Sequence, residues 1–266
     1  MSASITAAFI AQYTNEVHQL FQQQGSKLMN TVNVHKNVVG STYNFHKLGA
    51  VVANTKTRDA EITALDPTST QVTATLADYY AGVYADNLDL LKTNANIKAE
   101  HQKAAVNAIS RKVDDVIIAE MLTATNTTTT TAGGLTLAKI LEVVTYLNGN
   151  DVGDGDRYLL VGAKQVGEAL AIQQLTSADY VQVQAIMNSG IGTALGFKWI
   201  MSTRLTSASA TTVLGYVSDS VGLAVGQDIK TEINYIPTRV AWLTNSYVSL
   251  GAKLIDNLGI TKMTVA

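Results

Sequence analysis

One uninterrupted amphipathic pattern between residues 96 and 126 constrains this chain more than any other feature. Asn96 can cap the first turn, Glu100 suits the positive end of the helix dipole, and neither Gly nor Pro interrupts the run. At about 1.5 Å per residue, the predicted helix is on the order of 45 Å long, so the fold must be built along a rod as wide as a domain. Its apolar side chains recur at three- and four-residue steps: Ile97, Val106, Ile109, Val113, Val116, Ile117 and Met121.

The polar side of this helix carries charges of both signs. Arg111 and Lys112 stand beside Asp114 and Asp115. This arrangement predicts ion pairs along an exposed side rather than general acid catalysis. The helix is expected to end in the threonine-rich stretch 123–134, because threonines propagate helices poorly and the closing Gly-Gly pair releases the backbone.

Composition favours a surface that another protein covers. Charged residues make up only 15% of the chain, against about a quarter in an average soluble protein. Thr, Ser, Asn, Gln and Ala replace them, and these residues cost less to desolvate than Lys or Glu. Self-association explains this composition, and so does a merely neutral soluble domain. The net charge of −2 gives no overall basic field for nucleic acid, although local patches are compatible with it.

Several classes of protein are excluded by what the sequence lacks. With no cysteine, it has no disulfide scaffold, no thiolate nucleophile and no cysteine-ligated zinc. The first residues contain no basic segment of a signal peptide, and no apolar run approaches the ~20 residues of a membrane span. We therefore expect neither secretion nor membrane insertion.

The chain before the long helix predicts an arm and a ribbon. Helical spacing over 5–24 stops at Gly25, and the following residues 27–45 break into short extended pieces. Residues 50–62 and 70–76 then predict the two arms of a polar β-hairpin. An isolated ribbon of this kind is marginal in water, so it must lie on a neighbouring element or on another subunit.

After the long helix, the pattern alternates between helix and strand. Such alternation predicts a compact α/β layer from residue 135 to about residue 235, followed by a strand-rich return. The predicted elements are helices 137–147, 164–171 and 180–187, strands 157–162 and 197–201, and later strands 211–217, 231–243, 246–255 and 259–265.

A glycine-rich stretch at residues 190–196 superficially matches a dinucleotide-binding loop. Such a loop must follow a strand and open a helix, so that the helix N-terminus meets the phosphate. Here the predicted order is helix first and strand second. The glycines are therefore interpreted as a tight connection with unusual φ angles.

No metal or catalytic constellation is complete. The Asn- and Asp-rich loop 148–156 suggests a calcium site. A twelve-residue calcium loop from Asn148, however, would place Val152 at the fifth position and Leu159 at the twelfth, where oxygen ligands are required. The four histidines show no zinc-ligand spacing. We expect no catalytic, cofactor-binding or metal-binding residue.

The order of these parts resembles the major capsid proteins of tailed double-stranded-DNA bacteriophages, whose architecture is called the Hong Kong 97-like fold. The resemblance spans nearly the whole chain and consists of patterns of fold and assembly. Four stretches carry it: residues 23–28 in the arm, Arg58 in the ribbon, 157–161 in the central layer, and 189–192 running into 196–200.

The resemblance implies an α+β protein with a defined division of parts. Residues 1–48 would be the N-terminal arm and 49–91 the extended loop that reaches over a neighbouring subunit. Residues 92–134 and 236–266, with spine helix 96–126, would be the peripheral domain, and 135–235 the axial domain. Charged contacts at the ribbon can fix its register on a neighbour. The predicted inter-subunit contact residues are Arg58, Asp59, Glu61, Arg111, Asp114, Gly190, Gly192 and Gly196.

The implied function is that of a structural shell subunit without catalytic activity. Hexamers and pentamers of the chain would enclose packaged double-stranded DNA, contacted non-specifically, in a virion assembled in the host cytoplasm. A portal protein would be a partner. Because the chain is short for this family, we also expect a separate scaffolding protein.

Three alternatives remain at this point. An encapsulin-type compartment would enclose a cargo enzyme within the same fold. An α/β enzyme would bind nucleotide at the glycine-rich stretch. A tail-tube or adhesin subunit would assemble into tubes rather than shells.

Overall fold

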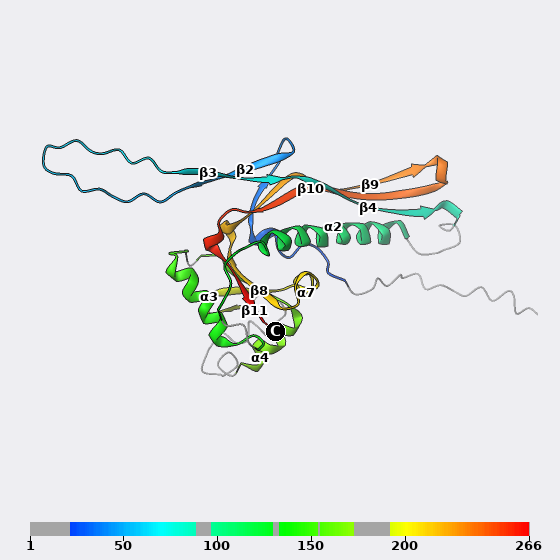
Figure 1. Cartoon of the computed structure of the whole chain (residues 1–266). Helices are drawn as coiled ribbons and strands as arrows, with labels where there is room; N and C mark the ends of the chain where they lie inside the picture. The colour runs from blue at the N-terminus through cyan, green and yellow to red at the C-terminus, as the bar shows by residue number, and fades with distance from the viewer. Residues whose placement is uncertain (1–21, 89–96, 130–132, 154, 173–191, 266) are drawn as a thin grey trace, which may run out of the picture.

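The fold was analysed in a computed structural model, which describes residues 22–88, 97–129, 133–153, 155–172 and 192–265. Two β-sheets share one long helix, and two β-structured projections leave the molecule at opposite ends (Figure 1). No helix among the described residues has both the length and the apolar character of a membrane-spanning segment.

The upper sheet rests on the long helix. Side chains of the sheet alternate between its two faces. On the strand at residues 77–86, Tyr79 and Ala81 pack toward the core, whereas Tyr80 is exposed, as expected for a sheet with one covered face. The apolar stripe of the helix meets the covered face, with Ile109 and Val113 buried. In spatial order the strands are β1 (Asn33–Lys36), β9 (Val221–Ile236), β10 (Ala241–Leu254) and β4 (Ala77–Asp86), and the helix is α2 (Ile97–Met121).

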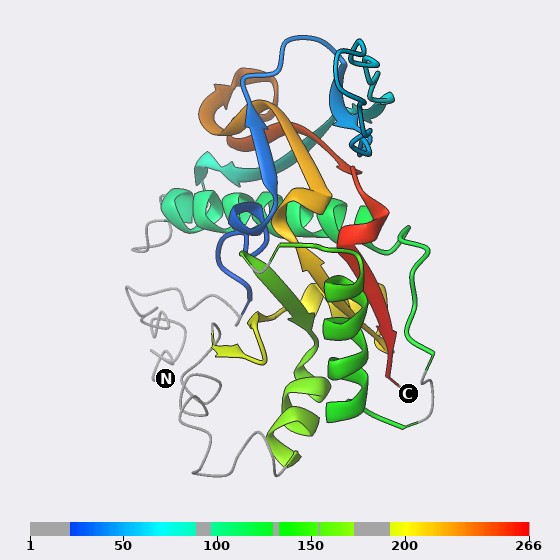
Figure 2. The ribbon, with the colours of Figure 1, turned by 90° about the vertical axis from the view of Figure 1, so that its left-hand side faces the viewer.

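The lower sheet has five strands, with helices packed on one face (Figure 2). Leu147 from α3 and Phe197 from β7 belong to its main buried cluster, whereas Leu160 and Tyr216 belong to the cluster around α2. Both faces are therefore covered. The strand order is β11 (Ile260–Thr264), β8 (Thr212–Val217), β5 (Arg157–Val161), β7 (Phe197–Met201) and β6 (Thr193–Ala194), and the helices are α3 (Leu137–Gly149), α4 (Ala163–Ala171) and α7 (Thr203–Ala208).

The chain crosses between the two sheets at two adjoining points. It passes from β8 to β9 through η3 (Ser218–Ser220) and returns from β10 to β11 through η5 (Asn257–Gly259). The backbone N–H of Ile255 donates to the carbonyl oxygen of Ser220 at 2.8 Å. The two sheets are thus held together where their connections touch.

Some predicted strands are wrong in extent. The hairpin pairs β2 (Thr42–Leu48) with β3 (Ser69–Thr75), whereas residues 50–62, predicted as its first arm, form no strand. The predicted strand 231–243 is interrupted by η4 (Pro237–Arg239), because proline cannot donate a ladder hydrogen bond and turns the chain there.

Other differences concern where elements end and which sheet they join. Helix α2 stops at Met121, before residue 126, because Thr125 and Asn126 bond to η5 instead. Strand β11 lies in the five-stranded sheet, whereas β9 and β10 lie together in the upper one. The predicted helices 5–24 and 180–187 and the Asn96 cap lie outside the described residues, apart from the last residues of the first.

Candidate assembly interface

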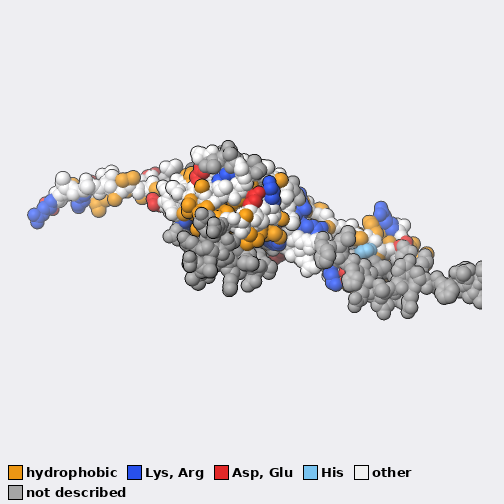
Figure 3. Space-filling model, turned by 90° about the horizontal axis from the view of Figure 1, so that it is seen from below, with side chains coloured by type: hydrophobic (Ala, Val, Ile, Leu, Met, Phe, Trp, Pro, Cys, Tyr) orange, Lys and Arg blue, Asp and Glu red, His pale blue; other side chains and the backbone are white. Residues whose placement is uncertain are grey.

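The loop of residues 49–68 leaves the body of the subunit as an extended projection (Figure 1). Every residue from 49 to 68 is exposed, and Val52 and Ile62 are each 80% exposed. Seen from below, basic side chains lie at the far end of this projection and hydrophobic ones along it (Figure 3). This segment adds no stability to a single subunit, because the segment buries no apolar surface against its own chain.

Three predicted contact residues lie at the tip of this loop. Arg58, Asp59 and Glu61 are all exposed, and the chain turns at Arg58 and Asp59. Asp59 has a φ of 67°, a left-handed value that Asp tolerates better than most residues. No ion pair joins any of the three to another residue in the described parts of the chain. Their charges are available to a second molecule.

The root of the loop, by contrast, is firmly attached. The ring of Phe45 on β2 is 5% exposed and fills the space above Gly222 on β9, where a side chain would overlap it. Lys47 on β2 forms a 2.7 Å ion pair with Asp256, next to η5. The Gly49 N–H donates to the Thr68 carbonyl oxygen at 2.7 Å and continues the β2–β3 pairing by one step. The projection therefore leaves from a fixed base.

Asp114 holds residues 26–28 of the N-terminal arm against α2. Its side chain lies in the interior of the subunit, although the sequence placed it on the polar side of the helix. The carboxylate accepts hydrogen bonds from the backbone N–H groups of Lys27 (3.1 Å) and Leu28 (3.2 Å), and from the Ser26 hydroxyl (2.5 Å). These donors explain how a charge is buried there. In this conformation Asp114 offers no surface to another subunit, so any inter-subunit role acts through the arm that it holds.

Arg111 also contacts the arm. Its guanidinium donates to the side-chain oxygen of Gln22 at 2.6 Å. Arg111 and Asp114 lie one turn apart on the helix, and both therefore bind the same segment of the arm. This arrangement could not be read from their charges alone, because the arm supplies neutral partners.

Residues 193–198, which include the end of the glycine-rich stretch, form a tight hairpin at the edge of the lower sheet. Strands β6 and β7 are joined by Leu195 and Gly196 alone, with φ values of 54° and 80°. Two consecutive positive φ values are typical of a type I′ turn, which matches the twist of the strands. Gly192 is buried, and its carbonyl oxygen accepts from the Trp199 N–H at 2.8 Å. Gly196 is exposed at the turn, and Gly190 lies outside the described residues.

The outer face of the upper sheet presents tyrosines and charges. Tyr80 and Tyr84 are 67% and 44% exposed, and Arg239 lies 4.6 Å above the ring of Tyr84. Lys230 forms a 2.8 Å ion pair with Glu232 and thereby lowers the pKa of that carboxyl. The same bond to Glu232 raises the pKa of Lys230. The sequence analysis did not predict this face. Two exposed tyrosines four residues apart in an alternating strand, Tyr80 and Tyr84, indicate it.

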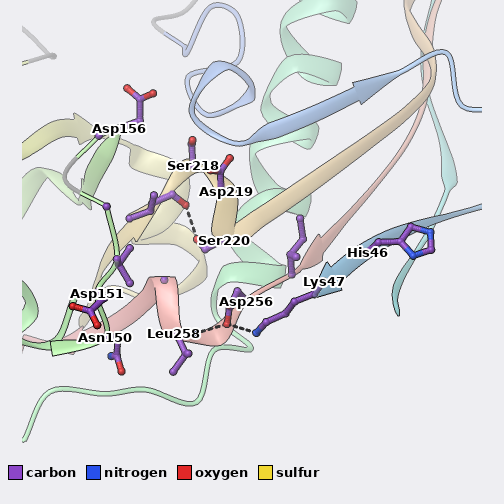
Figure 4. Close-up of a pocket in the computed structure, with 16 residues that line it drawn as sticks. His46, Lys47, Asn150, Asp151, Asp156, Ser218, Asp219, Ser220, Asp256 and Leu258 are labelled. Atoms are coloured by element: carbon purple, nitrogen blue, oxygen red, sulfur yellow. Dashed lines mark hydrogen bonds and ion pairs between the residues drawn. The ribbon is translucent and has the colours of Figure 1, made fainter. Parts of the chain in front are cut away.

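A cleft of about 520 Å³ lies where the loop root meets the lower half of the molecule (Figure 4). His46 and Lys47 line one side, and the loop that contains Asp151 lines the other. Buried Arg157 organises that loop, bonding to Asn148 at 2.8 Å. No cluster of three or more metal-ligating side chains occurs among the described residues. The cleft therefore separates the loop root from the lower half and has a mixed polar and apolar lining.

A profile of the phage capsid protein family matches residues 5–266. The chain belongs to this family. Its role is structural, because it is a major capsid protein and thus a building block of an icosahedral phage shell. The encapsulin alternative is not favoured. The family places the chain in the virion. No curated protein sequence matches it.

Solved capsid structures share its fold at low sequence identity. A chain from Mycobacterium phage Che8 aligns with a TM-score of 0.76 at 14% identity, covering 94% of this chain and 95% of that one. The capsid of the cyanophage P-SCSP1u gives 0.76 at 12% identity, covering 100% and 95%. The capsid of a native GTA particle gives 0.74 at 14% identity, covering 99% of both chains. These alignments confirm the Hong Kong 97-like fold.

Proposed function

We propose that loop 49–68 of each subunit lies on the neighbouring subunit, and that this contact repeats head to tail into hexamers and pentamers. The observation that carries the proposal is the fully exposed loop on a fixed root. A repeated head-to-tail contact generates rings, and two ring sizes can close a shell. Val52 and Ile62 would be covered in the ring, which supplies the burial that the single subunit lacks.

The charged tip would set the register of this contact. Arg58, Asp59 and Glu61 carry both signs within four residues, so a neighbour with complementary charges can recognise one position. Gly192 and Gly196 sit at the edge of the lower sheet, where we propose a second contact around the ring axis. Gly190, outside the described residues, stays a prediction for the same contact.

The two sheets suggest how the domains divide. We propose that the upper sheet with α2 is the peripheral domain and that the lower sheet is the axial domain. Since β11 pairs within the lower sheet, its residues would belong to the axial domain, while β9 would extend the peripheral one. The arm would comprise residues 1–48 up to the loop root, and the loop would occupy 49–68 of the predicted 49–91.

Further partners follow from the family role. We propose that packaged double-stranded DNA is contacted non-specifically, that a portal protein occupies one vertex, and that a separate scaffolding protein guides assembly in the host cytoplasm. We also propose that the chain has no enzymatic activity. Uniform closed shells from the protein expressed alone would contradict the need for scaffolding.

Electron microscopy of particles purified from cells that also make the proposed scaffolding protein tests the assembly. The expected particles are closed shells with five- and six-fold clusters. A matched variant in which residues 51–66 are replaced by a short Gly-Ser turn should fold but form no closed shells. Normal shells from this variant would contradict the role of the loop, and tubes from the unmodified protein would contradict the shell geometry.

A further inference from the structure

Strand β4 leaves one side of its backbone without a partner. It is the last strand of the four-stranded sheet and pairs with β10 alone among the described strands. The Asn87 N–H donates to the Val240 carbonyl oxygen, directly across the ladder. Since hydrogen-bonded positions alternate in an antiparallel pair, the even-numbered residues of β4 direct their N–H and C=O groups away from β10. These are Asp78, Tyr80, Gly82, Tyr84 and Asp86.

This edge of β4 has neither lysine, proline nor a bulge to protect it. Edge strands of monomeric proteins are commonly protected by lysine, proline or a bulge, because an open row of backbone groups pairs with other chains. Residues 77–86 contain neither lysine nor proline, and their register with β10 is regular over ten consecutive pairs. The edge is long, straight and available for another strand.

The chain also contains a strand-like segment without a partner. Residues 49–57 include Val51 and Val52 and contain no proline and no acidic residue. Valines favour strands, yet beyond Gly49, whose N–H bonds to Thr68, this limb forms no strand pairing in its own subunit. The opposite limb is less suitable, because it carries Glu61, Asp66 and Pro67.

The two features match in length and in charge. A nine-residue limb spans about 30 Å when extended, which is close to the length of a ten-residue strand. Lys56 lies near one end of the limb, and β4 has an aspartate near each end, Asp78 and Asp86. Whether the limb pairs with β4 in parallel or antiparallel, Lys56 therefore lies toward one of these two aspartates.

They cannot meet within one subunit. Strand β3 runs into β4 through Leu76 alone, so the loop and the distal part of β4 extend to opposite ends of the molecule (Figure 1). A second copy is needed to bring a loop to this edge.

We propose that residues 49–57 of one subunit add a strand to the open edge of β4 in the next subunit. This inference rests on the proposed head-to-tail contact and specifies its chemistry: main-chain hydrogen bonds supply the contact. Val51 or Val52 then lies beside Tyr80 and Tyr84 on the outer face of the extended sheet.

Introduced cysteines test this pairing cleanly, since the chain has none of its own. Val51→Cys or Val52→Cys is combined with Tyr80→Cys or Tyr84→Cys, and shells are oxidised and analysed on denaturing gels. Opposed strand residues lie within disulfide reach. The matched control replaces the loop cysteine with Val39→Cys, a position that is 97% exposed and lies outside both segments. We expect at least one loop and β4 pair to give multimers of the chain, and the control to give only a background level.

Hydrogen exchange of the unmodified protein covers the case in which a variant does not assemble. We expect exchange at Tyr80, Gly82 and Tyr84 to slow by about tenfold or more from unassembled subunits to shells. Closed shells without cross-links above the control would overturn the pairing and leave the shell function intact. Slowed exchange on β4 without a loop cross-link would assign the edge to a different strand, which also overturns it. Absence of shells from the unmodified protein, even when it is made together with the scaffolding protein, would remove the proposed head-to-tail assembly itself.

Discussion

Arg204 on α7 binds Asp115 on α2 through two parallel hydrogen bonds. Its Nε and Nη2 atoms each lie 2.7 Å from a different carboxylate oxygen of Asp115. This contact raises the pKa of Arg204, and it joins the helix under the upper sheet to a helix of the lower half. Paired donors on one planar group fix orientation as well as distance, so the contact holds α7 in a defined orientation against α2.

Replacing Arg204 with lysine tests this geometry. Lysine keeps the charge but loses the second parallel bond. Both partners are about one-third exposed, so we expect a loss of only about 1 kcal/mol in the unfolding free energy of the subunit, and a similar loss for Arg204→Ala. Urea unfolding of unassembled subunits measures it. As a control, Lys103→Ala removes an exposed ion pair with Glu100 and should change stability by less than about 0.5 kcal/mol. If Arg204→Lys and Lys103→Ala lowered the unfolding free energy equally, a special role for the two parallel hydrogen bonds of Arg204 would be contradicted.

Removing the Asp114 carboxylate should free the arm. In Asp114→Ala, the N–H groups of Lys27 and Leu28 lose their acceptors, and we expect a loss of about 2–4 kcal/mol in unfolding free energy. Asp114→Asn keeps one acceptor oxygen and should lose less. Hydrogen exchange at the two amides locates the effect. If both amides stayed protected in Asp114→Ala, the anchoring role would be wrong.

A methyl group at Gly251 should disturb the loop root. Strand β3 passes so close to β10 that a side chain at Gly251 would overlap the Thr75 carbonyl oxygen. We expect Gly251→Ala to destabilise the subunit by about 1–3 kcal/mol. Gly149→Ala is the matched control, because nothing lies within 4 Å of the added methyl there. Thermal unfolding that is unchanged in Gly251→Ala would show that the two strands separate easily.

The Lys230 and Glu232 pair predicts a mild acid sensitivity. Because the pKa of Glu232 is lowered in the folded chain, its contribution is present above the unfolded value of about 4.5 and is lost as the pH falls through the lower folded pKa. NMR titration should find the Glu232 carboxyl still ionised at a pH where an unperturbed glutamate is half protonated. Lys230→Ala should return that midpoint toward 4.5, and a midpoint unaffected by this change would contradict the pairing.

Local patterns predicted the parts of the fold that local physics determines. The spacing of Ile109, Val113 and Ile117 was enough to predict α2, since one face had to be buried. The two-residue turn at Leu195 and Gly196 likewise follows from its glycine. The environment of Asp114 did not, because its partners lie almost ninety residues earlier and include the backbone N–H groups of Lys27 and Leu28.

The loop shows why the predicted strand at residues 50–62 was wrong. Val51 and Val52 favour a strand, but strand pairing depends on a partner that the single chain does not provide there. The aromatic residues Tyr43 and Phe45 instead placed the paired strand earlier, where Phe45 finds a cavity above Gly222.

Hydrogen–deuterium exchange over residues 49–68, compared between unassembled subunits and closed shells, tests the central claim most directly. If the loop is stabilised only by a second copy, its amides should exchange freely in the subunit and become protected in the shell. Equal exchange in both states would contradict the account.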